Sequence, residues 1–384
     1  MKFTLRFADW LETHWVTPAY SGWLLIALAL CFFGAATNTM AGWLYVLCGL
    51  IMALLGINTV MARAALGRLQ VRRSPIEPVS AGEDLTIKLD IDNPSAKAST
   101  LLQVQEVLPF VLAQKQQTAI EVIAPGSTYQ WVYYAPTAVR GVYRWNEVNL
   151  RTATPLGLCW YRRSLEVAAK AIVYPQVLPL LRCPIIDTIG QDESIKLQSD
   201  HRYVTATEGV TRTLRPYRYG DPMRLIHWRT SARLGEFKVR ELEMITGGQD
   251  LIICLDSASS WHKEVFESAV IAAASLYFYA SRAQMNVKFW TAGSGVIHGN
   301  RLVLETLATV ESEEEKLTDS LPNVSLVWLT QNASTLDRLS LNSRWVFFAP
   351  SEGDKITHLM TENFSGLLIN RDEPLQQQLQ RGIR

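Results

Sequence analysis

The feature that most constrains this chain is a stretch from Thr13 to Ala62 that contains no Asp, Glu, Lys or Arg. Two apolar runs, at about residues 19–36 and 40–62, are separated by a short polar corner. Each run approaches the roughly 20 residues that a helix needs to cross the hydrocarbon core of a bilayer. Because the backbone must satisfy its own hydrogen bonds in lipid, we expect residues 1–66 to form a transmembrane helical hairpin.

The residues that flank this hairpin predict its orientation. Positively charged side chains lie on both outer flanks, and the corner is uncharged; the basic residues are Lys2, Arg6, Arg63, Arg68, Arg72 and Arg73. Positively charged flanks favour the cytoplasmic side. We therefore expect a two-helix protein of the cell (inner) membrane with both termini and its soluble domains in the cytoplasm. The acidic Asp9 and Glu12 and the second apolar run argue against a cleaved signal peptide.

The next region, residues 67–178, alternates apolar and polar residues with a period of two. A clear example is Leu85–Ile91, which ends at Asn93 and Pro94. Short alternating runs separated by turn residues are typical of an antiparallel β-sandwich. We expect further strands at 101–108, 119–123, 129–134, 141–150 and 169–174.

A different pattern begins at residue 246 and continues to about residue 372. The apolar run Leu251–Leu255 precedes Asp256, and an amphipathic helix is expected from about Lys263 to Arg282. Further apolar strands alternate with helical segments, including short helices at 335–339 and 355–363. This alternation predicts a mostly parallel, Rossmann-like α/β sheet, in which ligands bind beyond the carboxyl ends of the strands. Residues 373–384 are predicted to be a tail with a frayed helix.

Between these regions, residues 179–245 contain an Arg-rich segment. From Arg212 to Arg240 there are seven Arg and one Lys against Asp221 and Glu236, a net charge of +6 in a chain whose formal net charge is +1. The pattern and its position after two apolar spans and a β region resemble the DUF58 family. The residues that carry the resemblance are Arg215, Tyr217, Gly220, Asp221, His227, Trp228, Ser231 and Arg233.

Three further segments also resemble DUF58 proteins: Ala138–Tyr143, Thr154–Leu158 and Val173–Pro175. The resemblance implies a multidomain α+β architecture in which the last domain is von Willebrand factor A-like. It also implies that the partner is a MoxR-type AAA+ ATPase, because DUF58 proteins are commonly encoded beside such ATPases. The family resemblance indicates an architecture more firmly than an activity.

The residues of the Arg-rich segment allow three interpretations. In the first, an Arg pairs with Asp221 while His227 and Trp228 are packed at a domain interface. In the second, several Arg form a docking surface for carboxylates or phosphates, either of a protein partner or of a sensed anion. In the third, Asp221, His227 and Ser231 form a hydrolase triad, but no nucleophile elbow accompanies them. Nucleic-acid binding is disfavoured, because no helix-turn-helix or ribonucleoprotein motif is present.

The expected von Willebrand factor A-like domain also raises the question of a metal ion. Such domains often hold Mg²⁺ through a D-x-S-x-S loop and oxygen ligands on two later loops. Here Asp256 and Ser260 match the first loop, but Ala258 replaces the middle Ser, and Thr330–Asn332 supplies no Asp. We therefore expect at most a degenerate Mg²⁺ site, with no certain cofactor. Asp256 is alternatively expected to cap the helix that follows it.

Taken together, these patterns predict a membrane-tethered adaptor that is not an enzyme. The expected role is to dock a partner protein, a MoxR-type AAA+ ATPase, during the assembly or maturation of membrane or envelope complexes. A metal-assisted or Ser-His hydrolase and an anion-sensing protein that uses the Arg residues remain the alternatives.

Overall fold

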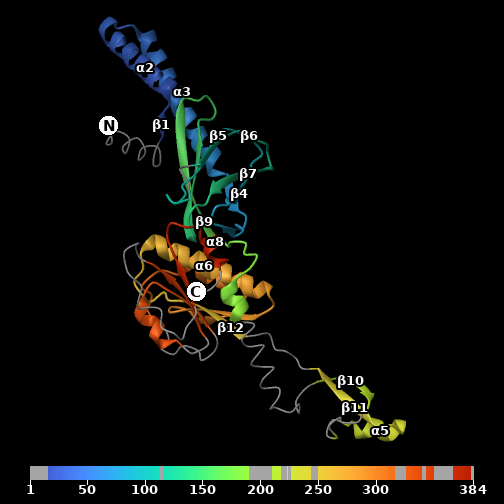
Figure 1. Ribbon diagram of the computed structural model, residues 1–384. Helices are drawn as coiled ribbons and strands as arrows, with labels where there is room; N and C mark the ends of the chain where they lie inside the picture. The colour runs from blue at the N-terminus through green and yellow to red at the C-terminus, as the bar shows by residue number, and fades with distance from the viewer. Residues whose placement is uncertain are drawn as a thin grey trace. The chain divides into compact units, whose positions relative to one another are not determined.

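The structure is a computed structural model that describes residues 16–112, 116–189, 210–217, 223, 226–243, 250–315, 326–339, 343–349 and 366–381. The chain divides into two compact units, Met1–Tyr174 (unit one) and Pro175–Arg384 (unit two). The fold is mixed α/β, with two apolar helices near the N-terminus (Figure 1). This confirms the coarse prediction of a mixed fold with an N-terminal helical pair.

The two apolar helices are α2 (Tyr20–Thr39) and α3 (Gly42–Gly67). They meet at Met40, which adopts a left-handed conformation with φ 50°. Both helices are long and apolar enough to cross a membrane. Most of their large apolar side chains are exposed rather than packed, including Trp23, Leu30 and Trp43. Exposed apolar helices of this length fit membrane association, since a soluble core helix would bury one face.

Unit one also contains two sheets that are mainly antiparallel. The strand order of the first is β1-β9-β8-β5-β6, with β3 pairing β9, and that of the second is β2-β4-β7. The first sheet contains β1 (Thr17–Pro18), β3 (Val79–Ser80), β5 (Ser99–Glu106), β6 (Gln116–Ile123), β8 (Gly141–Thr152) and β9 (Cys159–Tyr174). The second contains β2 (Gln70–Arg73), β4 (Asp84–Asp92) and β7 (Thr128–Pro136).

Alternate residues of these strands share one core. Leu85, Ile87, Leu89 and Ile91 of β4 are all fully buried, as the period-two pattern predicts. Strand β9 begins ten residues earlier than expected, at Cys159. Its first half has no clean alternation of buried and exposed residues, and it is held as a strand by its long pairing with β8, in which the register shifts once, between Trp145 and Glu147.

A buried ionic cluster joins the two sheets of unit one. Glu106 of β5 is 0% exposed, and its carboxylate accepts hydrogen bonds from the Tyr133 hydroxyl (2.6 Å) and the Trp145 indole. Arg73 of β2 forms an ion pair with the same carboxylate and lies over the Trp145 ring. Burial raises the pKa of Tyr133, with the negative charge of Glu106 adding to the effect.

Unit two contains a six-stranded sheet with the order β14-β13-β12-β15-β16-β17. All its neighbouring strands are parallel except the β13–β14 pair. The strands are β12 (Asp250–Leu255), β13 (Asn286–Thr291), β14 (Gly295–Ile297), β15 (Leu326–Thr330), β16 (Arg344–Phe348) and β17 (Gly366–Ile369).

Both faces of this sheet are buried, as continuous apolar strands predict. Leu251, Ile253 and Leu255 of β12 pack in one core cluster with α6 (Lys263–Arg282), α7 (Asn300–Thr309) and α8 (Leu375–Leu379). Ile252 and Cys254 pack in a second cluster with residues of η2 (Ala333–Arg338), a 3₁₀-helix where a helix at 335–339 was expected. The helix expected at 355–363 lies outside the described residues.

The prediction of a frayed C-terminal helix is wrong. Leu379 of α8 is fully buried in the core of unit two, and Gln378 is 2% exposed. A run of Gln residues does not predict burial. Gln378 can be buried because its amide forms hydrogen bonds with the backbone of Asn370 and Glu373.

Candidate functional site

The Arg-rich segment folds as a two-stranded ribbon with a short helix. Strand β10 (Val210–Pro216) pairs antiparallel with β11 (Lys238–Glu243), and α5 (Trp228–Leu234) lies between them in the chain. Ile226 forms an isolated bridge to Val239, and both side chains are buried. Gly235 ends the helix in a left-handed conformation with φ 71°, which favours glycine.

His227 and Ser231 hold this ribbon and helix together. His227 is the N-cap of α5, where its Nδ1 accepts a hydrogen bond from the Thr230 backbone N–H (3.2 Å). The Ser231 hydroxyl oxygen is buried and accepts a hydrogen bond from the Lys238 backbone N–H (2.9 Å). The backbone N–H of His227 donates to the backbone carbonyl of Lys238 (2.8 Å). His227 Nδ1 and Ser231 Oγ therefore stabilise the fold of α5 and its connection to β11.

An aromatic group lies on the outside of the same element. Phe237 makes edge contacts with Tyr217 (6.2 Å between ring centroids) and with Trp228 (6.0 Å). Trp228 is 56% exposed and Phe237 54% exposed. Arg229 and Arg233, one helical turn apart on α5, are also exposed. We call Tyr217, Trp228, Phe237, Arg229 and Arg233 the α5 surface.

The structure brings together only part of the predicted motif. Tyr217, His227, Trp228, Ser231 and Arg233 belong to the ribbon and its helix, and the half-buried Arg215 donates a hydrogen bond to the Pro216 carbonyl. Gly220 and Asp221 lie outside the described residues. Trp228 is exposed, whereas the first interpretation of the motif packed it at an interface. Phe237 was not predicted as a site residue. It follows the motif, and its ring contacts both Tyr217 and Trp228.

A second polar group lies at the carboxyl edge of the parallel sheet. Asp256 follows β12, is 3% exposed, and its carboxylate accepts hydrogen bonds from the hydroxyls of Ser259 (2.7 Å) and Thr330 (2.8 Å). Thr330 is the last residue of β15, which pairs with β12. These two strands adjoin where the strand order reverses, which is the place where open parallel sheets bind ligands.

The contacts of this group differ from the expected metal loop. Ser260, which was expected to share a metal site with Asp256, donates to the Glu313 carboxylate (2.7 Å), and the neighbouring Ser259 donates to Asp256. Asp256 does not cap α6, whose N-cap is His262. Thr330 and Glu313 were not predicted as site residues; the position of Thr330 directly after an apolar strand was the available signal. Within the described residues, no group of three or more His, Cys, Asp or Glu side chains could hold a metal ion.

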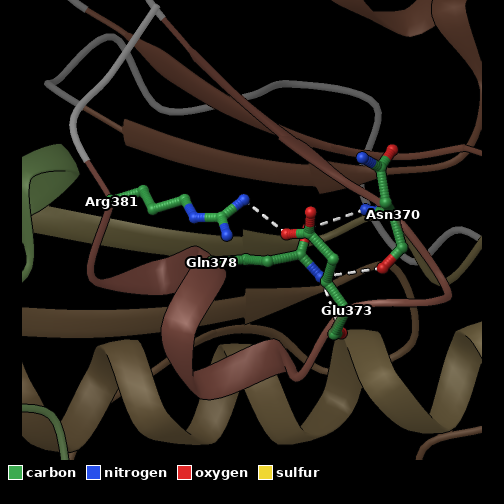
Figure 2. Close-up of polar contacts among 4 residues, drawn as sticks. All are labelled: Asn370, Glu373, Gln378 and Arg381. Carbon is green, nitrogen blue, oxygen red and sulfur yellow. Dashed lines mark hydrogen bonds and ion pairs between the residues drawn. The ribbon is translucent and has the colours of Figure 1, made fainter.

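A cavity of about 330 Å³ lies at the carboxyl ends of β16 and β17. Its lining includes Val265, Phe348, Arg371 and Glu373. Figure 2 shows how its C-terminal wall is held: the Gln378 amide nitrogen donates to the carbonyls of Asn370 (2.7 Å) and Glu373 (2.8 Å). The Gln378 amide oxygen accepts from the Asn370 N–H (2.8 Å), and Arg381 pairs with Glu373. This wall is thus held by the hydrogen bonds of the buried Gln378 amide and by the Arg381–Glu373 ion pair.

Two cysteines of unit two are shielded rather than reactive. Burial raises the pKa of the Cys183 thiol to about 12, and burial also raises the pKa of Cys254 on β12. Because the thiolate is the nucleophile, neither group is suited to covalent catalysis at neutral pH.

Comparison with known families supports the resemblance drawn from the motif. Residues 213–298 match the family model described as "Protein of unknown function DUF58". This match covers β11, the α5 surface, β12 and α6, and it carries no assigned activity. No curated protein matches the sequence.

Three solved structures show a distant likeness to this chain. One is a late embryogenesis abundant (LEA) type protein, with 11% identity and a TM-score of 0.20 over 31% of this chain and 84% of that one. Another is a GH20 exo-β-N-acetylglucosaminidase from Vibrio harveyi, with 11% identity and a TM-score of 0.16 over 68% of this chain and 57% of that one. A β-glucuronidase from Bacteroides uniformis has 11% identity and a TM-score of 0.16 over 76% of this chain and 37% of that one. All three TM-scores are too low to inform the fold.

Proposed function

We propose that this protein is a membrane-tethered adaptor that docks a protein partner through the α5 surface. In this proposal α2 and α3 span the cell membrane and both ends of the chain are cytoplasmic. The two sheets of unit one form a β-sandwich, and the parallel sheet of unit two forms a von Willebrand factor A-like domain.

The observation that carries the proposal is the exposure of two aromatic and two basic side chains on α5 and just after it: Trp228, Arg229, Arg233 and Phe237. Large aromatic side chains in water forgo the free energy of burial, about 25 cal/mol for each Å² of apolar surface. Trp, Tyr and Arg are also the residues that dominate binding energy at protein interfaces. A partner that presents acidic and apolar side chains together would complement this surface.

The hydrogen bonds of His227 and Ser231 favour an adaptor over a hydrolase. A catalytic serine needs its hydroxyl to donate to a histidine base. Here His227 Nδ1 accepts from the Thr230 N–H, which places the proton of the neutral ring on Nε2 and leaves neither ring nitrogen available as a base. Ser231 Oγ accepts from the Lys238 N–H. These contacts assign both side chains to the support of the α5 surface.

The DUF58 resemblance suggests the class of partner. We propose a MoxR-type AAA+ ATPase, which the adaptor brings to membrane or envelope complexes during their assembly or maturation. The net positive charge of the Arg-rich segment fits a partner surface that contains carboxylates.

The test is recovery of the partner from native membranes with tagged full-length protein in the presence of ATP. Mass spectrometry should find an AAA+ ATPase with the wild type, and Trp228→Ala and the double variant Arg229→Glu, Arg233→Glu should lose it. Tyr134→Ala is the matched control, since Tyr134 is a similarly exposed aromatic residue in unit one. Recovery of no AAA+ ATPase, or equal recovery with Trp228→Ala, would refute the proposal.

A further inference from the structure

The segment 154–158 of unit one lies directly against the base of the helical hairpin. The Leu156 N–H donates to Oδ1 of Asn58 on α3 (3.1 Å), an Asn whose side chain is fully buried. The Gly157 carbonyl accepts from the Ser21 hydroxyl (3.1 Å), and the Leu158 carbonyl accepts from the Ala19 N–H (2.8 Å). Backbone groups of three consecutive residues, 156–158, thus form hydrogen bonds with α3 and with the first residues of α2 and its N-cap.

Glycine makes this close approach possible. A Cβ at Gly22 of α2 would lie 2.2 Å from the Leu158 carbonyl oxygen, which no side chain can tolerate without movement of the backbone. Gly34, on the same helix, has nothing within 4 Å of its ideal Cβ position. The loop and the hairpin are therefore packed backbone against backbone at one end of α2.

The contacts of α3 indicate where the bilayer begins. Helix α3 has 26 residues against 20 in α2, and its last turns pack on the β-strands. The Arg163 guanidinium of β9 donates to the Leu66 carbonyl (2.7 Å), and Leu66 belongs to the core of unit one. The part of α3 before Asn58 remains available to lipid, and it is about 25 Å long at 1.5 Å per residue.

Exposed side chains near this level are those expected at a membrane interface. Tyr20 and Trp23, in the first turn of α2, are largely exposed, and aromatic residues favour the headgroup region. Leu156 is 54% exposed at the tip of the loop. Two basic residues come after Asn58 in the chain, and both are exposed: Arg63 in α3 and Arg68 at its C-cap.

We infer that the loop 154–158 is a third membrane-contacting element, in which Leu156 enters the interfacial layer of the bilayer that α2 and α3 cross. The β-strands of unit one then lie at the membrane surface, in a fixed position relative to α2 and α3. The exposed Leu156 is bound through its N–H to α3, whose exposed side chains in this region are mainly apolar, and this identifies lipid as the occupant. This inference rests on the membrane insertion in the proposed function.

The test uses full-length protein in vesicles of phosphatidylethanolamine and phosphatidylglycerol, with the photocrosslinking residue p-benzoylphenylalanine at single positions. The positions are Leu156, the exposed Leu30 in the middle of α2, and the exposed Tyr134 of β7 as control. We expect lipid adducts at Leu30 and Leu156 and none above background at Tyr134. Gly22→Ala should reduce the Leu156 adduct severalfold, and Gly34→Ala should leave it unchanged.

Two results would overturn the inference while leaving membrane insertion intact: lipid adducts at Leu30 but none at Leu156, or adducts of Leu156 to a second copy of the chain. Absence of lipid adducts at Leu30 as well would refute both the inference and the proposed membrane insertion. A lipid-soluble diazirine probe applied to the unmodified protein checks the result without substitution. It should label the peptide containing Leu156 and spare the peptide containing Tyr134.

Discussion

Two buried carboxylates, Glu106 in unit one and Asp256 in unit two, are held in different ways. Glu106 pairs with the Arg73 guanidinium and accepts from a phenol and an indole. Asp256 accepts from two hydroxyl groups, and within the described part of the chain no basic side chain forms an ion pair with it. The first carboxylate has a charged partner in the core, whereas the second is held by neutral donors.

The difference separates a carboxylate that is neutralised within the core from one that is not. A buried ion pair with every oxygen used links two sheets and leaves nothing for a ligand. Asp256 has only neutral donors and lies at the reversal of strand order, which is the place where open parallel sheets bind ligands. The following predictions test this comparison.

The largest effect is expected from Glu106→Gln. The substitution keeps the size of the side chain but leaves Arg73 buried without its counter-charge, which costs about 3–5 kcal/mol of unfolding free energy. Denaturant unfolding of full-length protein in detergent measures the change for unit one. Glu121→Gln, at an exposed position of β6, should have almost no effect; equal stability of the Glu106 and Glu121 variants would show that the cluster is not a structural lock.

Asp256→Asn should have a smaller effect, about 1–2 kcal/mol. The amide oxygen can still accept from Ser259 and Thr330, but the hydrogen bonds lose the assistance of the charge. Unfolding of unit two reports the loss, with the exposed Asp372→Asn as the control. A loss as large as that of Glu106→Gln would mean that the two carboxylates do not differ in role.

Alkaline pH should test a second phenol–carboxylate contact, the hydrogen bond from the Tyr279 hydroxyl of α6 to the Asp187 carboxylate (2.8 Å), through its effect on stability. Burial, together with the Asp187 hydrogen bond and charge, raises the Tyr279 pKa from 10 to about 12. The folded state therefore favours the neutral phenol, so its contribution is complete below pH 10 and is lost as the pH rises towards 12.

Thermal unfolding across this pH range should show a shallower decline for Tyr279→Phe than for the wild type. Cys183, whose pKa is also raised to about 12, titrates in the same range, so the comparison is repeated in a Cys183→Ala background. Identical slopes with and without the Tyr279 hydroxyl would contradict the prediction.

The smallest effect is expected from Mg²⁺. A single carboxylate with Ala258 in the middle position supplies few hard oxygen ligands, so millimolar Mg²⁺ should shift the melting temperature of unit two very little. Ligand binding stabilises a fold in proportion to the logarithm of concentration over Kd. A clear upward shift that Asp256→Asn abolishes would instead reveal a functional metal site.

Local pattern predicted most of the elements. The alternation in Asp84–Asp92 and the continuous apolar run in Asp250–Leu255 correctly distinguished a half-buried strand from a strand buried on both faces. The start of β9 and the burial of Gln378 were missed, because the strand depends on its pairing with β8 and the amide on loop carbonyls. Neither partner is evident from neighbouring residues.

The candidate sites were predicted less completely. Asp256 was identified by its place after a strand, but its partners Ser259 and Thr330 were not, because the loop path decides which hydroxyl reaches the carboxylate. In the Arg-rich segment, residue types alone left three interpretations: a structural role for His227, a docking surface, and a triad that includes His227 and Ser231. The hydrogen bonds of His227 with Thr230 and of Ser231 with Lys238 show that both side chains hold the local structure.

The sequence by itself determined the apolar helical pair, the change from period-two strands to continuous apolar strands, and the charge of the Arg-rich segment. These properties follow from hydrophobic burial and charge, which act on residue type and short-range spacing. Only the tertiary structure decided that Glu106 meets Arg73, that Leu156 reaches Asn58 and that Trp228 faces solvent. Such contacts join residues far apart in the chain, and their geometry depends on how whole elements pack.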